Sequence, residues 1–181
     1  MEKDLTDVRT RQAPSFKLYR SKPEDALITD HAVTVSEQLE DPVHGRVKPG
    51  SQDYGDTWTY GIHQAVGGMH DAPNPGDMLA AALAACLDST IRMIANRMGI
   101  TLKFLQVEVS SDVDVKGTLV IDPNIPVGFN KMRTNVRIKP AGNISQEKIH
   151  QLLKASEYSC VNLQTLRNGV EVETSLEISQ A

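Results

Sequence analysis

The sequence predicts an α+β fold, in which antiparallel sheets pack against a long cysteine-bearing helix and a second helix. Two observations carry this prediction. Segments that alternate with a period of two occur in groups, and only two helical segments interrupt them. Both ends of the longer helical segment also carry residues that are typical of helix termini. Grouped strands are typical of antiparallel sheets covered by helices rather than of regular βαβ units.

The first strands are predicted within residues 31–66. The stretch 31–38 (HAVTVSEQ) alternates and is rich in β-branched residues, and 41–45 (DPVHG) consists of turn formers. A hairpin is therefore expected, with its return strand beginning in 45–50 (GRVKPG). Residues 57–66 (TWTYGIHQAV) form a further strand whose buried face carries Trp58, Tyr60, Ile62 and Val66.

The long helix is predicted over residues 75–98. The loop 67–77 (GGMHDAPNPGD) ends in Pro75, whose fixed φ suits a first helical turn. Gly99 can adopt the left-handed conformation that ends a helix, and Arg92 and Arg97 lie near the negative end of the helix dipole.

The second half of the chain predicts further strands and a second helix. Strands are expected at 106–115, 118–122 and 130–139, the last with Met132, Thr134, Val136 and Ile138 facing inward. Ser145 is the expected N-cap of the second helix. A short helical turn follows from Cys160 to about Gly169, and the alternation in 170–178 (VEVETSLEI) predicts a closing strand.

The length of 181 residues and the hydrophobic content of 40% suit one domain with a core. Residues 1–28 are polar, contain Pro14 and Pro23 and show no periodicity. We therefore expect an N-terminal arm at 1–28, held against a partner subunit, and a single domain at 29–181.

Charge and hydropathy exclude several classes of partner. A net charge of -4 opposes a phosphate-binding surface, so no nucleic acid is expected. The longest apolar run, 78–87, is too short to span a bilayer, and the N-terminus lacks the apolar stretch of a secretory signal. A cytoplasmic protein that does not enter a membrane is expected. The five histidines show no metal-ligand spacing, so neither a metal nor another cofactor is expected.

Two interpretations of the cysteines, a packing role and a chemical role, follow from their surroundings. On a helix its neighbours include Leu79, Leu83 and Met93, an apolar face on which a free cysteine acts as a small hydrophobe. Alanines beside it would let another helix approach closely. Cys160, in contrast, falls at a helix start, where the dipole lowers the pKa of a thiol and favours the reactive thiolate. Packing and chemistry both remain open at this point.

The segment NPGDMLAAALAACLDSTIRMIANRMGI (74–100), together with Cys160 in YSCVNLQTLRNGVEVE (158–173), resembles the OsmC/Ohr family of osmotically inducible and organic hydroperoxide resistance proteins. The resemblance implies an intertwined homodimer with the long helices at its centre. It also implies a thiol peroxidase for organic hydroperoxides, with Cys86 as the peroxidatic thiol, Cys160 as the resolving thiol and a dithiol or lipoyl-type reductant. Arg46, in the N-terminal hairpin, is the residue that would activate Cys86. The apolar pocket would lie near Leu79, Leu83 and Met93, with Asp77 beside it.

The chain departs from the family pattern at two positions. The family's glutamate, ten positions before the first cysteine, is replaced by Gly76, and Asp77 is the adjacent carboxylate. The resolving cysteine is followed by Val161 instead of proline. The alternative is therefore a non-catalytic OsmC-like protein that binds a small apolar ligand or responds to redox state as a binding module.

Overall fold

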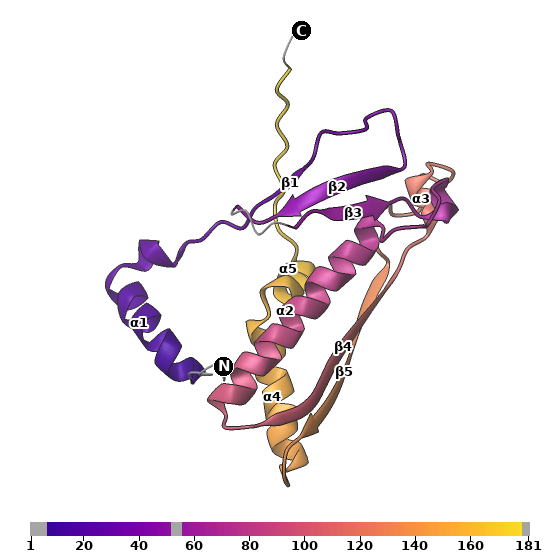
Figure 1. The fold of residues 1–181 in the computed structure, drawn as a ribbon. Helices are drawn as coiled ribbons and strands as arrows, with labels where there is room; N and C mark the ends of the chain where they lie inside the picture. Colours follow the sequence, from indigo (N-terminus) through magenta and orange to yellow (C-terminus); the bar gives the residue numbers. More distant parts are fainter. Residues whose placement is uncertain (1–6, 52–55, 179–181) are drawn as a thin grey trace.

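The structure is a computed structural model that describes residues 7–51 and 56–178. The first six residues of the predicted arm and the last three of the predicted domain lie outside the described residues. The fold is α+β, as predicted. Helix α2 (Pro75–Arg97) runs through the middle, with a two-stranded sheet along one side and a three-stranded sheet at its N-terminal end (Figure 1).

The three-stranded sheet is antiparallel and consists of β1 (Ala32–Thr34), β2 (His44–Pro49) and β3 (Trp58–Gly61) in that order. This confirms the predicted hairpin. The strand predicted over 57–66 is wrong beyond Gly61. There His63 accepts a hydrogen bond from the amide of Ala65 and begins a 3-10 turn, η2 (Gln64–Val66). Trp58, expected to be buried, is half-exposed.

Helix α2 has the predicted boundaries, and local hydrogen bonds explain them. The Asn74 side chain accepts from the amides of Gly76 and Asp77, while the Asp77 carboxylate accepts from the amide of Asn74. This reciprocal capping satisfies donors that a helix start leaves unpaired. At the other end Gly99 has a φ of 66°, the left-handed conformation that the sequence predicted.

The second sheet pairs β4 (Leu102–Asp112) with β5 (Lys131–Pro140), which are antiparallel. Side chains of β5 alternate between exposed and half-buried, as predicted for its inward set. Strand β4 begins four residues earlier than predicted. The strand predicted at 118–122 is wrong, because Asp114 caps a helical turn, α3 (Val115–Thr118), and the chain then turns at Val120 with a φ of 56°.

Helices α4 (Gln146–Ser159) and α5 (Val161–Asn168) complete the layer that packs on α2. Ser145 caps α4 as predicted. The core lies between these helices and the second sheet; its buried apolar residues are Leu83, Leu87, Ile91, Ala95, Ile100, Leu152, Cys160 and Leu163.

Length and composition alone would let α2 cross a membrane, contrary to the argument from run length. Within the described chain it is the one helix with this property. Its inner face, however, packs Leu83, Leu87 and Ile91 into the core. Core helices of soluble proteins share this composition.

Both ends of the chain differ from expectation. Part of the arm forms helix α1 (Val8–Ser21), followed by a 3-10 turn, η1 (Pro23–Ala26). Helix α1 contacts α2 of the same chain, where the Arg9 guanidinium donates to the carbonyl of Arg97 at 3.0 and 2.6 Å. The closing strand predicted at 170–178 is wrong for the described structure. That segment pairs with no strand there and leaves the body of the fold (Figure 1).

Candidate active site: two cysteines between three helices

Helix α2 positions Cys86 near its middle, eleven residues after Pro75 and therefore about 16 Å along the axis from the helix start. Its carbonyl accepts hydrogen bonds from the hydroxyls of Ser89 at 2.9 Å and Thr90 at 2.7 Å. Its side chain is partly exposed and packs against the core. Cys86 thus has one side against buried residues and another open to reactants.

Cys160 occupies the joint between two helices. It ends α4 and precedes α5, with an extended backbone at φ -80° and ψ 108°. Its side chain is fully buried and belongs to the core. The break between the helices directs this thiol toward α2 instead of along either helix surface.

The two thiols meet. Cys160 Sγ donates to Cys86 Sγ across 3.4 Å, although the residues are 74 positions apart in sequence, and both cysteines are free. A disulfide needs the sulfurs at about 2.05 Å, so a small movement of one helix against the other suffices to form one. The structure thereby brings together the two cysteines that the sequence analysis singled out.

Burial raises the pKa of the Cys160 thiol above its ordinary value, and the contact with Cys86 raises it further. Hydrogen bonds from the backbone of Leu163 and Asn162 act in the opposite direction and are outweighed. The prediction that the helix start lowers this pKa was therefore wrong. Its reason was sound, since the backbone amides do favour the thiolate, but desolvation is the larger effect.

Arg46 and Asp77 lie away from the thiols. Arg46 is on β2, where its guanidinium pairs with Glu37 at 3.2 Å, and both side chains are about half exposed. Asp77 is engaged in capping α2. The single chain does not bring either charge to Cys86.

Gly76, which stands where the family has glutamate, lies under the ring of Phe129. A Cβ at Gly76 would come within 3.0 Å of Phe129 Cζ and 2.9 Å of Asn74 Oδ1. A larger side chain would have to displace the ring, so glycine is what permits this contact. Phe129 belongs to a loop, and no sequence pattern distinguished it beforehand.

The four predicted pocket residues do not all share one cavity. Leu79 lines a cavity of about 960 Å³ beside the start of α2, together with Asp77 and Phe129. Leu83 is buried and lines a second cavity of about 440 Å³ against β5 and α5. Met93 is 42% exposed and lines neither of these two cavities.

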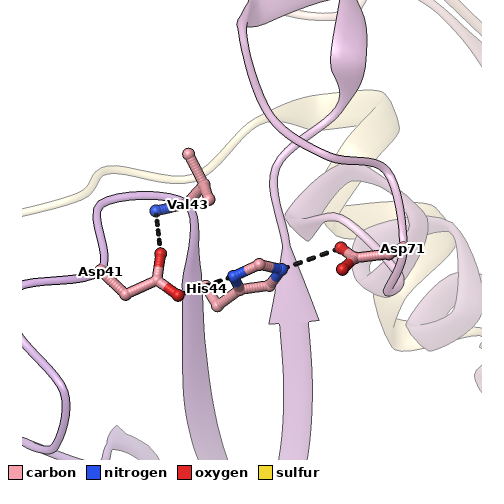
Figure 2. A network of polar contacts seen from close by, with 4 residues as sticks. All are labelled: Asp41, Val43, His44 and Asp71. Carbon is pink, nitrogen blue, oxygen red and sulfur yellow. Dashed lines mark hydrogen bonds and ion pairs between the residues drawn. The ribbon is translucent and has the colours of Figure 1, made fainter.

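A polar network that the sequence analysis missed joins the first sheet to the loop before α2. His44 on β2 contacts Asp41 through Nδ1 and Asp71 through Nε2, both at 2.8 Å (Figure 2). Hydrogen bonds to Asp71 and Asp41 raise the pKa of His44. The pKa of Asp71 is lowered chiefly by its bond to His44, and that of Asp41 chiefly by the amide of Val43 and then by His44.

This fold and this site define the chain as a two-cysteine α+β protein whose thiols lie in contact beside a long central helix. It belongs to the family of OsmC-like proteins, whose family model matches residues 68–175. No curated protein sequence matches the chain.

Solved structures share the fold. An OsmC-like protein from Mycoplasma pneumoniae is 15% identical, with a TM-score of 0.62, and the match covers 78% of this chain and 89% of that one. An organic hydroperoxide resistance protein from Legionella pneumophila is 23% identical, with a TM-score of 0.55 and coverage of 81% and 95%. A protein of the same description from Elizabethkingia anophelis is 20% identical, with a TM-score of 0.55 and coverage of 80% and 92%. At these identities the likeness concerns the fold alone.

Proposed function

We propose that this protein is a thiol peroxidase that reduces organic hydroperoxides, with Cys86 as the peroxidatic thiol and Cys160 as the resolving thiol. The contact of 3.4 Å between the two sulfurs carries the proposal. The assignment of roles rests on exposure. Cys86 is partly open to an incoming peroxide, whereas Cys160 is fully buried and its raised pKa keeps its proton.

The chemistry proceeds in two steps. The Cys86 thiolate attacks a peroxide oxygen, the O–O bond breaks, and the hydroperoxide leaves as the alcohol while Cys86 becomes a sulfenic acid. The Cys160 sulfur then attacks the sulfenic sulfur, its proton joins the departing hydroxyl, and water and a disulfide result. A dithiol of the lipoyl type restores the two thiols by exchange.

The proposal includes a homodimer. The chain exposes 14163 Å² of surface, whereas a compact monomer of 19.9 kDa exposes roughly 8,700 Å². The tail supplies part of the excess, since Val170, Val172 and Leu176 are each more than two-thirds exposed. In a dimer this alternating segment would pair with a strand of the partner, and Arg46 of one subunit would be free to approach Cys86 of the other.

The first test counts free thiols after one equivalent of an organic hydroperoxide is added to the fully reduced protein. Rapid loss of both thiols and a peptide linking Cys86 to Cys160 are expected. Cys86→Ser should abolish the reaction, whereas Cys160→Ser should stop at the sulfenic acid. Turnover that survives Cys86→Ser would refute the proposal. Sedimentation of the same sample measures the mass, and a mass of 19.9 kDa would refute the dimer.

Gly76 favours a second candidate, a non-catalytic protein that binds a small apolar ligand. The Phe129 ring lies against Gly76, where a longer side chain would meet it, and the cavity of about 960 Å³ beside it has the size of a ligand pocket. Five valines contribute to its wall: Val66, Val109, Val113, Val115 and Val127. This candidate predicts saturable binding of an apolar fluorescent probe that Phe129→Asp abolishes, with thiols that react with peroxide no faster than a free cysteine.

A further inference from the structure

We propose that Asn162 is a positioning residue that holds the resolving thiol beside Cys86 by tying helix α5 to helix α2. Asn162 follows Cys160 by two residues, and its Nδ2 donates to the carbonyl of Ala82 at 2.9 Å. The two bonded residues are 80 positions apart in sequence. The inference rests on the proposed function, because it assigns a role in the second step of that reaction.

The acceptor of this bond lies one helical turn before Cys86. In an α-helix the carbonyl of residue 82 is also the acceptor for the amide of residue 86. Asn162 therefore attaches α5 to the same peptide group that supports the backbone of Cys86. Each partner of the bond is within four residues of one of the reacting sulfurs, so the bond controls the spacing between the two backbone segments that carry them.

Helix α5 needs such a tether. It has eight residues, too few for stability in isolation, and no side chain caps its N-terminus. Leu163 packs α5 into the core by apolar contact, which has no fixed direction. Among the described residues, the other side-chain hydrogen bonds from α5 to a neighbouring helix run to α4, where Gln164 Nε2 donates to the carbonyl of Glu157 at 2.8 Å and Arg167 pairs with the Glu157 carboxylate at 3.0 Å. Those bonds fix the angle between α4 and α5, whereas the bond of Asn162 fixes the position of α5 against α2.

The geometry makes the second step sensitive to that distance. The sulfurs must close from 3.4 Å to about 2.05 Å while the Cys160 proton passes to the departing hydroxyl. Positioning of reacting groups at this scale changes rates strongly, since a displacement of about 1 Å can cost roughly a hundredfold. The first step does not involve Cys160 or helix α5, so its rate does not depend on the tether.

The test compares Asn162→Leu, which removes the amide without adding charge, with Asn168→Leu as the matched control. Asn168 lies on the same helix, and within the described residues its side chain donates to the carbonyl and the side-chain oxygen of Gln164 in α5. Rapid-mixing kinetics with an organic hydroperoxide separate loss of the Cys86 thiol from appearance of the disulfide. In Asn162→Leu the rate at which the Cys86 thiol is lost should equal that of the wild type. The rate of disulfide formation should fall by about five- to tenfold, which corresponds to the loss of one hydrogen bond. Asn162→Gln, which keeps the amide, should recover part of the loss.

A second readout needs no peroxide. The equilibrium between thiols and disulfide is measured in glutathione redox buffers, and Asn162→Leu should form the disulfide less readily by the same factor while Asn168→Leu matches the wild type. The proposal would be overturned if Asn162→Leu left both the rate of disulfide formation and the thiol–disulfide equilibrium unchanged, or if Asn168→Leu changed them equally. If Cys86 is inert to peroxide in every chain, the peroxidase assignment fails, and the glutathione equilibrium still decides the role of Asn162. Circular dichroism of each variant establishes that it is folded.

Discussion

Oxidation of the cysteine pair should stabilise the protein substantially. A disulfide between Cys86 and Cys160 would close a loop of 74 positions in the unfolded chain. The loss of chain entropy in a loop of that length corresponds to about 4.5 kcal/mol at 25 °C. The native sulfurs must still move together from 3.4 Å, which costs part of this gain, so we expect the oxidised protein to be more stable by about 2–4 kcal/mol.

Urea unfolding of the oxidised and reduced protein, followed by circular dichroism at one protein concentration, measures this difference. For a chain of 181 residues the same gain raises the midpoint of thermal unfolding by roughly 5–10 °C. Cys160→Ser, which cannot form the bond, should show no difference between the two conditions. If peptide mapping shows the disulfide and the unfolding midpoints still coincide, the pair is strained in the folded protein and the reasoning from loop entropy fails.

Three further predictions follow from the packing and the charges. His44 carries a raised pKa, so its bonds stabilise the fold fully below pH 6.5 and lose that effect as pH rises through the raised value. The bonds that lower the pKa values of Asp71 and Asp41 stabilise the fold above pH 3.8, and this stabilisation is lost as pH falls through the lowered values. Asp71→Asn should therefore flatten the dependence of thermal stability on pH in both ranges. Leu87 is fully buried, so Leu87→Ala should cost about 2–5 kcal/mol in urea unfolding, whereas Leu79→Ala, at 40% exposure, should cost under about 1 kcal/mol. Arg9→Ala removes both bonds to the carbonyl of Arg97, and hydrogen exchange should become faster across α1 while α2 keeps its protection.

Helices α2 and α4 were the predictable part of the fold, because the residues that mark their ends act locally. Pro75, Gly99 and Ser145 each act within one turn, and the structure uses all three as expected. The alternation in β5 also predicted its strand correctly, since one sheet face is half-buried and the other is in solvent.

The errors arose where an alternating pattern lacked a partner strand. Residues 118–122 are apolar enough for a strand, but Asp114 caps a helical turn just before them. The segment 170–178 alternates more regularly, yet it finds no strand to pair with in the described part of the chain. Alternation predicts that one face will be buried and does not identify the chain that buries it. The proposed intertwined dimer would account for the second case, because a strand of the partner subunit would pair with this segment.

The pairing of the two cysteines could not be derived from their spacing, and the resemblance to a family supplied it. The reactivity of Cys160 was misjudged for a related reason. A helix start was visible in the sequence, but the burial that opposes it depends on the packing of α2, α4 and α5 together. In the proposed reaction the proton of Cys160 has a use, because the condensation must deliver a proton to the departing hydroxyl as the sulfur attacks. The core that raises its pKa thus keeps that proton next to Cys86 until a sulfenic acid forms.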